Sequence, residues 1–180
     1  TIRQLIRIMA LLQVRTFPDS ILKQVAKPVE VFDTALRKTA ENMLETMYAS
    51  QGIGLAANQV AILKRLVVID IKSGAEDESE RDPHIFVNPN IIEQSGETIS
   101  EEGCLSVEEF RAEVKRAERI TLEYQDVVGQ PHTLAAEGLM AICIQHELDH
   151  LRGVLFIDHL PPLKQKMVKR RLAKQARLSA

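Results

Sequence analysis

The sequence predicts an α+β fold in which short antiparallel or mixed β-sheets pack around a central helix, with a further helix at the C-terminus. Two observations carry this prediction. Apolar residues recur at helical spacing near the beginning of the chain and again near its end. Short β-branched segments bounded by turn-forming residues fill the stretch between them.

Three helices are expected. Asp33-Thr34 is a possible N-cap for the first, which covers Leu36 to Ser50 and repeats apolar residues every three or four positions. The second covers Glu137 to Arg152 and contains a long apolar run. Pro161-Pro162 breaks the chain, and the last helix follows over Leu163 to Leu178.

The strands are expected between the first and second helices. Gly52 and Gly54 end the first helix and open a loop. Arg65 to Ile71 is apolar and β-branched, which predicts a buried strand, and the acidic segment Lys72 to His84 predicts an exposed loop. Four further short strands are expected over Ile85 to Val87, Gly96 to Ser100, Arg119 to Tyr124 and His132 to Ala135.

Composition limits the classes of function. The chain has 180 residues, 45% of them apolar and 27% charged, which suits one globular domain. A net charge of −2 argues against a generally nucleic-acid-binding surface. No apolar run approaches the roughly 18–20 residues of a membrane span, so no membrane association is expected.

The N-terminal segment shows no export signal. Arg3 and Arg7 precede only Ile8 to Leu12, which is shorter than the roughly 7–15 apolar residues of a signal-peptide core. The sequence therefore predicts a cytoplasmic protein in which Cys104 and Cys143 are thiols or metal ligands rather than a disulfide.

Met9-Ala10 resembles a natural start of translation. Residues 1–8 are therefore expected to be an upstream or vector-derived extension. Residues 9–180 are expected to form a single catalytic domain, whose last part, 163–180, is a basic C-terminal helix.

The most informative motif is H-E-x-x-H, formed by His146, Glu147 and His150 in the second helix. Residues four apart lie on one face of a helix, so the two imidazoles can bind one metal ion. The glutamate beside the first histidine can serve as general base to an activated water. This pattern is typical of enzymes that hydrolyse amides.

Two histidines leave a third ligand to be found. The metzincin pattern would need a histidine at position 156, which is Phe156, and no glutamate follows the motif. Asp158 and His159 are downstream options, and Cys104 is an upstream one. Cys143 is better interpreted as a small apolar residue lining a pocket beside the metal. From the residues alone, the choice stays open.

Three motifs together resemble those of one family. They are G-I-G-L-A-A-N-Q at Gly52 to Gln59, E-G-C-L-S at Glu102 to Ser106, and Q-H-E-L-D-H at Gln145 to His150. Their sequences, order and separation are similar to the three motifs of peptide deformylases. The resemblance runs from about Leu12 to the C-terminus and is to the bacterial type with a C-terminal helix.

The resemblance implies removal of the N-formyl group from the N-terminal methionine of newly made proteins, with release of formate. It implies that Cys104, His146 and His150 hold one divalent metal ion per chain. Fe²⁺ is the physiological metal that the family implies, and a preparation could hold Zn²⁺, Ni²⁺ or Co²⁺ instead.

The resemblance also assigns catalytic roles. Glu147 takes the proton of the attacking water and returns one to the leaving amine. The side chain of Gln59 and the backbone N–H of Leu105 donate to the oxyanion of the tetrahedral intermediate. A primary amide suits this role because it donates without titrating.

Two contacts with the substrate are implied. The peptide backbone pairs with a strand edge, which reads chain direction more than sequence, at Ile53, Gly54 and Gly103. The methionine side chain enters an apolar pocket, for which the candidates are Ile53, Leu139, Ile142 and Cys143, with His146 at the floor. Arg111 resembles an arginine that contacts the peptide beyond methionine, and an exposed surface charge is the alternative interpretation.

The sequence departs from the family pattern at two positions. Glu108 stands where proline is usual, so the strand after the site is expected to be more mobile or differently hydrogen-bonded. Ser100 stands where an aliphatic pocket residue is usual, although a register shift could place Ile99 there instead. Both changes bear on substrate and inhibitor fit and leave the ligands intact.

The C-terminal helix concentrates basic residues in a chain that is net negative. Similar helices in the family dock near the ribosomal exit tunnel, which implies contact with ribosomal RNA. The protein is otherwise expected to be a monomer.

Two alternatives remain from the residues. One is a zincin-like endopeptidase with Asp158 or His159 as third ligand. The other is a structural zinc protein with Cys143 as fourth ligand and a basic RNA-binding tail.

Overall fold

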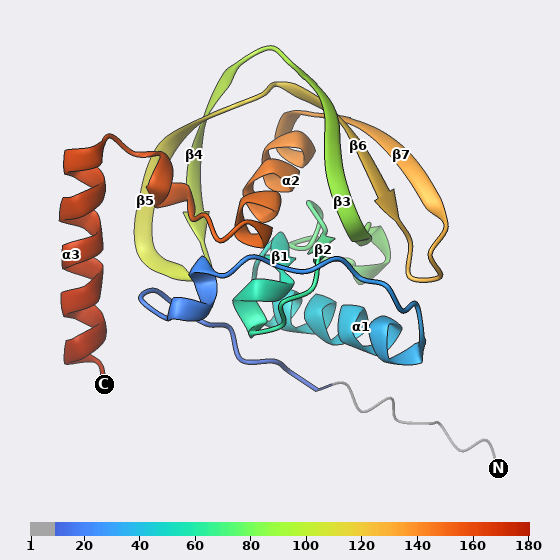
Figure 1. The fold of residues 1–180 in the computed structure, drawn as a ribbon, viewed down its shortest axis with the longest axis horizontal. Helices are drawn as coiled ribbons and strands as arrows, with labels where there is room; N and C mark the ends of the chain where they lie inside the picture. The colour runs from blue at the N-terminus through green and yellow to red at the C-terminus, as the bar shows by residue number, and fades with distance from the viewer. Residues whose placement is uncertain (1–9) are drawn as a thin grey trace.

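The computed structural model describes residues 10–180, so the extension expected at residues 1–8 lies outside the described residues. Within them the fold is α+β, with antiparallel sheets and a C-terminal helix (Figure 1). No helix among residues 10–180 combines the length and apolar character that crossing a membrane requires.

The three expected helices are present, each within two residues of its predicted ends. They are α1 (Thr34–Ala49), α2 (Gly138–Leu151) and α3 (Pro162–Leu178). The predicted N-cap of α1 is confirmed, because the Asp33 carboxylate accepts a hydrogen bond from the Leu36 N–H at 2.9 Å. Four short 3₁₀ helices cover Ser20–Lys23, Ala57–Val60, Glu78–Glu80 and Phe156–His159.

The larger sheet has five antiparallel strands in the order β1-β2-β3-β6-β7. Their bounds are β1 Gly54–Ala56, β2 Leu66–Ile69, β3 His84–Ser95, β6 Arg119–Gln125 and β7 Pro131–Glu137. The second sheet is the hairpin of β4 (Thr98–Cys104) and β5 (Val107–Arg116). In Figure 1, β3 continues over the top of the molecule into β4, and β5 returns into β6, so the two sheets together form an arch over α2.

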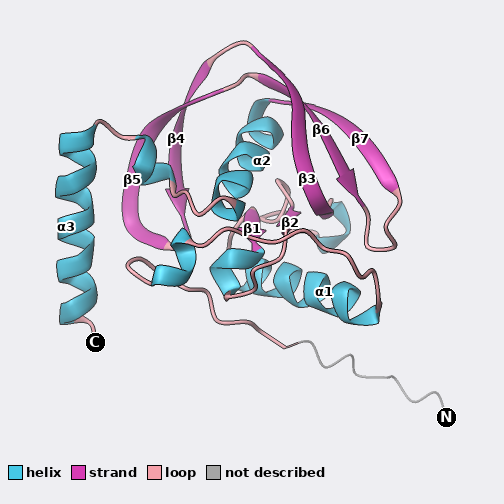
Figure 2. Ribbon diagram, viewed as in Figure 1, coloured by secondary structure: helices cyan, strands magenta, loops and turns pink. Residues whose placement is uncertain are grey.

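Strand β2 explains how the core divides into two layers. All four of its residues are buried, as expected for a strand that is covered on both faces. Leu66 and Val68 pack in the cluster that contains α1. Val67 and Ile69 pack in the cluster that contains Ile144 of α2. Helix α2 is thereby fixed between the larger sheet and the hairpin (Figure 2).

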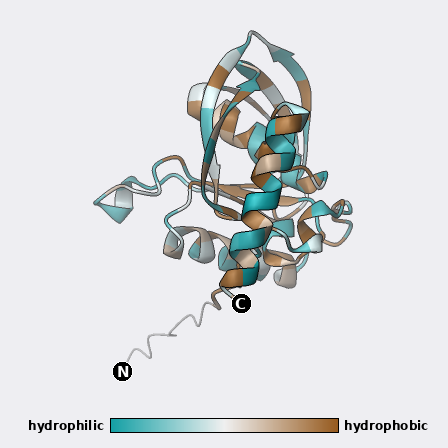
Figure 3. Ribbon diagram, turned by 90° about the vertical axis from the view of Figure 1, so that its left-hand side faces the viewer, coloured by the Kyte–Doolittle hydropathy of each residue, from teal (hydrophilic) through white to brown (hydrophobic). Residues whose placement is uncertain are grey.

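Helix α3 packs against the outer side of the hairpin (Figure 1). Its buried residues, Val168 and Leu172, belong to a cluster with Val107 of β5 and Phe156. Figure 3 shows α3 facing the viewer, with hydrophilic segments interrupting the hydrophobic ones. The helix therefore fixes one face and leaves most of its surface to solvent.

The predicted strands differ from the observed ones at several points. Strand β5 was not predicted, because its first half, Val107 to Arg111, does not alternate between buried and exposed positions. Strand β3 extends to Ser95 rather than ending at Val87, since β6 pairs with it along most of its length. Gly96 has φ 68° and forms the turn before β4, so it does not begin a strand.

Candidate active site and metal centre

Three potential metal ligands converge at the centre of the arch. Cys104 ends β4, and His146 and His150 lie one helical turn apart on α2. One ligand atom from each residue lies within 4.8 Å of the other two, and Cys104 Sγ is 3.3 Å from His150 Nε2. The sequence prediction that these three residues meet is confirmed in position. A Cys-His-His set of this kind suits a divalent transition metal.

The ring nitrogens of the histidines fit a metal site. His146 Nδ1 contacts Glu102 Oε1 at 2.8 Å, which leaves Nε2 to face a metal. Burial lowers the pKa of His150 well below its usual value and favours the neutral imidazole that ligation requires. Burial also lowers the pKa of His146, but contacts with Cys104 and Glu102 outweigh it and raise that pKa. Metal binding would therefore displace a proton from His146.

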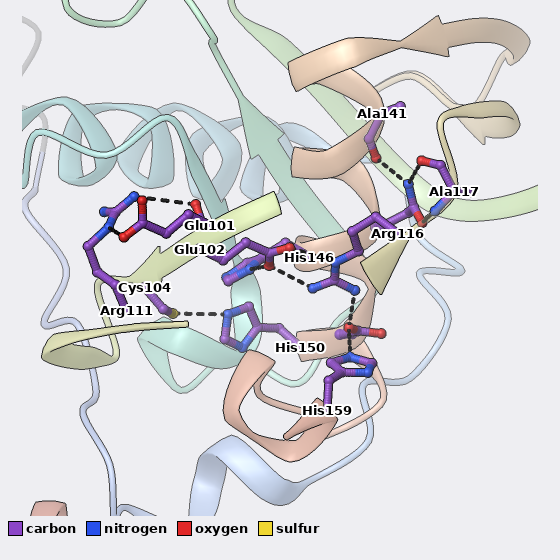
Figure 4. Close-up of polar contacts among 12 residues, drawn as sticks. Glu101, Glu102, Cys104, Arg111, Arg116, Ala117, Ala141, His146, His150 and His159 are labelled. Atoms are coloured by element: carbon purple, nitrogen blue, oxygen red, sulfur yellow. Dashed lines mark hydrogen bonds and ion pairs between the residues drawn. The ribbon is translucent and has the colours of Figure 1, made fainter. Parts of the chain in front are cut away.

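A buried ion network supports His146 from behind (Figure 4). Both carboxylate oxygens of Glu102 accept from the Arg116 guanidinium, each at 2.8 Å. Arg116 also donates to Asp149 at 2.7 Å, and the same Asp149 oxygen contacts His159 Nε2 at 2.7 Å. The bidentate pair fixes Glu102, and Glu102 in turn fixes the plane of the His146 ring.

Glu147 is the buried acid of the motif. Burial raises the pKa of its carboxyl to about 7. Its Oε2 has no hydrogen-bond partner among the described residues. A buried, unsatisfied carboxylate oxygen destabilises the fold unless another role retains it. The position and the raised pKa both suit a group that exchanges protons near neutral pH.

Gln59 lies close to Cys104, in the 3₁₀ helix that follows β1. Its Oε1 accepts from the Ala56 N–H at 2.9 Å, which fixes the orientation of the amide. Its Nε2 donates to Ser106 Oγ at 3.1 Å and approaches Cys104 Sγ at 3.6 Å. The amide hydrogens of Gln59 therefore point to the cysteine end of the site.

Cys104 and His146 line a cleft with a volume of about 630 Å³, a size that accommodates a small ligand. All seven residues predicted to contact substrate line it: Ile53, Gly54, Gly103, Arg111, Leu139, Ile142 and Cys143. Gln59, Leu105 and Glu147 line the same cleft. Among the described strands β1 is an edge strand, so one side of it can pair with an extended peptide.

Gly54 is the position where a side chain would disturb the site most. A Cβ atom there would lie 2.6 Å from Glu147 Oε1 and 2.9 Å from Cys143 Sγ. Both distances are well below van der Waals contact, so only glycine lets β1 pass so close to the acid.

Both departures from the family pattern can be placed. Ser100 lines the cleft and Ile99 is 67% exposed, so the register shift considered from the sequence does not occur. Glu108 is exposed within β5, and Glu109 after it has φ 59°, in the left-handed region. The greater mobility expected at this point stays a prediction.

Sequence reasoning overlooked several residues around the site. Arg116 and Asp149 were given no role, although both are buried charged residues and Asp149 lies within the Gln145 to His150 motif. Phe110, which also lines the cleft, stacks on Phe156 with ring centroids 6.2 Å apart. A buried charged residue in a strand indicates an ion pair. The partners of Arg116 are distant in sequence, so only the folded structure identifies them.

The alternative ligands lie elsewhere. Asp158 accepts from the Leu155 N–H and from Lys169, and His159 contacts Asp149. The metal-binding group found among residues 10–180 contains neither of them, and it does not include Cys143. The endopeptidase and structural-zinc interpretations are therefore not favoured.

The fold and this site together define the class of H-E-x-x-H metallohydrolases. Comparison with known proteins specifies the class further. Residues 11–166 match the family model described as polypeptide deformylase. The peptide deformylase of Chromobacterium violaceum is 53% identical over 167 residues, which cover 93% of this chain and 97% of that protein.

Solved structures agree with the sequence comparison. The peptide deformylase of Legionella pneumophila superposes with a TM-score of 0.85 at 43% identity, covering 94% of this chain and 98% of that one. The peptide deformylase of Synechococcus elongatus, solved with actinonin, gives 0.82 at 41% identity, covering 89% and 86%. The chain belongs to the polypeptide deformylase family, and it is a hydrolase of formyl-methionyl peptides.

Proposed function

We propose that Cys104, His146 and His150 hold one divalent metal ion and that the chain uses it to remove the formyl group from N-formyl-methionyl nascent proteins. The observation that carries the proposal is Glu147: it lines the same cleft as Cys104 and His146, and its buried Oε2 has no partner among the described residues. Fe²⁺ is proposed as the metal in the cell, and Zn²⁺, Ni²⁺ or Co²⁺ as substitutes in a preparation.

When bound, the ion supplies a Lewis acid that lowers the pKa of a water toward neutrality and polarises the formyl group. Glu147 Oε2 accepts the proton of the attacking water, and its raised pKa matches that task. The same carboxyl then donates a proton to the leaving amine, so formate and a free N-terminus are released. No other described acid lining the cleft is both deeply buried and unpaired.

The developing oxyanion needs donors that are already in place. We assign this role to the Gln59 amide and the Leu105 backbone N–H, which flank Cys104. The bond from Ala56 N–H to Gln59 Oε1 supports the assignment, because it holds the amide with its N–H groups toward the cysteine.

The substrate backbone would pair with the edge of β1 at Gly54 and with Ile53 just before it, with Gly103 also lining the cleft. The methionine side chain would enter between Leu139, Ile142 and Cys143, which project from α2. Arg111 is exposed and contacts Glu101, a position that suits contact with the peptide beyond methionine.

The test is formate release from N-formyl-Met-Ala-Ser by protein purified anaerobically with Fe²⁺ or Ni²⁺. The control is Glu147→Ala with its metal content measured. Metal-dependent release that disappears in a fully metallated Glu147→Ala protein supports both the activity and the role of Glu147. No release from metal-loaded wild-type protein would overturn the proposal.

A second proposal concerns α3 and the place where the enzyme works. Lys164, Lys166, Arg170, Arg171, Lys174 and Arg177 are exposed on it, and no acid follows Asp158 in the sequence. We propose that α3 contacts RNA phosphates near the ribosomal exit tunnel and that the enzyme is a cytoplasmic monomer. Residues 9–180 would then be a single catalytic domain whose last helix, 163–180, is the docking element.

Because α3 also buries Val168 and Leu172, charge reversal tests this role better than truncation. Lys166→Glu, Arg170→Glu and Lys174→Glu together should abolish co-sedimentation with ribosomes at low salt. The matched control is Lys166→Arg, Arg170→Lys and Lys174→Arg together, which changes the same three positions and keeps their charge. Unchanged co-sedimentation of the reversed variant would contradict the role of α3, and formate release from the short peptide should be unaffected in either variant.

A further inference from the structure

The turn that joins β4 to β5 contains a motif residue to which the proposed reaction assigns no part. Cys104 of β4 pairs with Val107 of β5, and Leu105 and Ser106 form the turn between them. Cys104 is a candidate metal ligand and Leu105 a candidate oxyanion donor. The Ser106 side chain is fully buried, and the Phe17 backbone N–H donates to the Ser106 carbonyl at 2.8 Å. The turn therefore holds the Ser106 hydroxyl in a fixed place.

The partner of this hydroxyl is the side chain of Gln59. Gln59 Nε2 donates to Ser106 Oγ at 3.1 Å, and both side chains are buried. The same nitrogen approaches Cys104 Sγ at 3.6 Å. A primary amide has two N–H groups, which diverge within one plane. One of them therefore points to the Ser106 hydroxyl, and the other points to the cysteine end of the cleft.

Two hydrogen bonds together fix the plane of the Gln59 amide. At one end, Oε1 accepts from the Ala56 N–H at 2.9 Å. Because a backbone N–H can only donate, this contact also distinguishes the oxygen of the amide from its nitrogen. At the other end, Ser106 Oγ accepts one N–H. The terminal torsion of an amide side chain is broad, so the contact at Oε1 alone would leave the plane free to tilt.

We propose that Ser106 is a positioning residue, whose hydroxyl accepts one N–H of Gln59 and thereby aims the other at the developing oxyanion. This inference rests on the proposed function, in which Gln59 is an oxyanion donor. A donor stabilises a transition state most when it is oriented beforehand, because no reorganisation is then needed. Without the Ser106 acceptor, a buried N–H would lose its partner and the amide would turn.

The kinetic test is Ser106→Ala in metal-loaded protein, with formate release from N-formyl-Met-Ala-Ser as the assay. We expect kcat to fall about tenfold and KM to stay within about twofold, since the oxyanion develops only after the substrate is bound. Metal content should equal that of wild type. Thr46→Val is the matched control, because it removes another buried hydroxyl, which lies on α1 and accepts from the Leu12 N–H. This control should leave kcat unchanged.

A double-mutant cycle separates positioning from a merely structural role. If Ser106 acts through Gln59, Ser106→Ala should lower kcat by less than about twofold once Gln59→Ala is present. A structural role would lower kcat by the same factor in both backgrounds, and that result would overturn the proposal. A kcat of Ser106→Ala equal to that of wild type would also overturn it.

Nuclear magnetic resonance gives a readout that does not depend on activity. In isotope-labelled protein, the side-chain amide of Gln59 is identified by its loss from the spectrum of Gln59→Ala. We expect Ser106→Ala to shift one of the two N–H resonances of this amide and to speed its exchange with solvent. If Ser106→Ala does not fold, Ser106→Gly replaces it, because glycine is tolerated in turns and also lacks the hydroxyl.

The two readouts distinguish failure of this inference from failure of the proposed function. Wild-type protein that releases no formate would overturn the proposed function. Unchanged Gln59 resonances in the Ser106→Ala variant of an active enzyme would overturn the role of Ser106 alone.

Discussion

Glu147 lies in the candidate active site, and the burial of its carboxylate destabilises the fold. Its side chain is buried and one carboxylate oxygen has no described partner. In the metal-free protein its folded pKa, about 7, lies above the usual value for glutamate. Because folding favours the protonated form of Glu147, the free energy of unfolding decreases as pH rises from the unfolded pKa through about 7.

We therefore predict that Glu147→Gln stabilises the metal-free protein at pH 8, by about 1–3 kcal/mol, because it removes a buried charge. At pH 5 the gain should be smaller, since Glu147 is then largely protonated. The measurement is urea unfolding of both metal-free proteins at the two pH values. An equal gain in stability at pH 5 and pH 8 would show that it does not come from ionisation of Glu147.

Gly54 gives a second prediction at this scale. Alanine there should displace Glu147, since its Cβ would lie 2.6 Å from Oε1. We expect kcat for formate release to fall about tenfold or more while the metal is retained. Gly74→Ala is the control, because no heavy atom lies within 4 Å of a Cβ at that position. Equal activity of the two variants would show that the close approach is not functional.

The residues of the site differ in how far the sequence alone predicts them. His146 and His150 follow from helical periodicity, and Cys104 follows only from its resemblance to a family motif. Arg116 could not be found in either way. Its partners, Glu102 and Asp149, are 14 and 33 residues away, and only the folded hairpin brings all three together.

At the scale of elements, the ion network joins the hairpin to α2. Burial alone would raise the pKa of Glu102, but its hydrogen bonds with Arg116 and His146 lower it. The bonds of Asp149 with His159 and Arg116 likewise outweigh burial and depress its pKa. The stability contributed by these carboxylates is therefore present above their unfolded pKa, roughly 4, and is lost as pH falls through the depressed values.

Arg116→Met tests this connection. At pH 7 it should destabilise the protein by about 3–5 kcal/mol, because two buried carboxylates lose their partner. The difference from wild type should shrink as pH falls below about 4, where the carboxylates of the unfolded chain protonate, toward the depressed pKa values of the folded protein. Melting temperatures from pH 3 to 7 provide the measurement. Lys115→Met, which removes an exposed pair with Glu97, should change little. A pH-independent difference would argue against the network.

Element prediction succeeded where periodicity was regular. Strand β5 escaped it because Glu109 interrupts the alternation, with φ 59° in the left-handed region. The three-residue strand β1 was interpreted as loop, since its short length and the glycine at its start give no strand pattern. Both elements form walls of the cleft. The sequence therefore predicts the candidate metal ligands and the acid better than it predicts the strands that surround them.

At the scale of the whole molecule, the proposed metal site connects parts of the chain that are distant in sequence. Its candidate ligands come from the hairpin and from α2, so metal binding should stabilise the complete fold. Free metal at 100 times its Kd would contribute about 2.7 kcal/mol. We predict a rise in melting temperature when metal is added to wild type, and a much smaller one in Cys104→Ser. Cys143→Ser should keep the full rise, because Cys143 is not in the metal-binding group. An equal loss in both variants would contradict the ligand assignment.

The same separation has a consequence for how the enzyme is made. Cys104 and His150 are 46 residues apart, so at ordinary elongation rates about 2–9 s pass between their synthesis. During that interval the nascent thiol has no histidine partners and no protecting ion. A thiol in that state is open to oxidation, which would leave a finished chain unable to assemble its centre. The yield of active enzyme should therefore depend on oxidant levels during translation, before the first substrate is encountered.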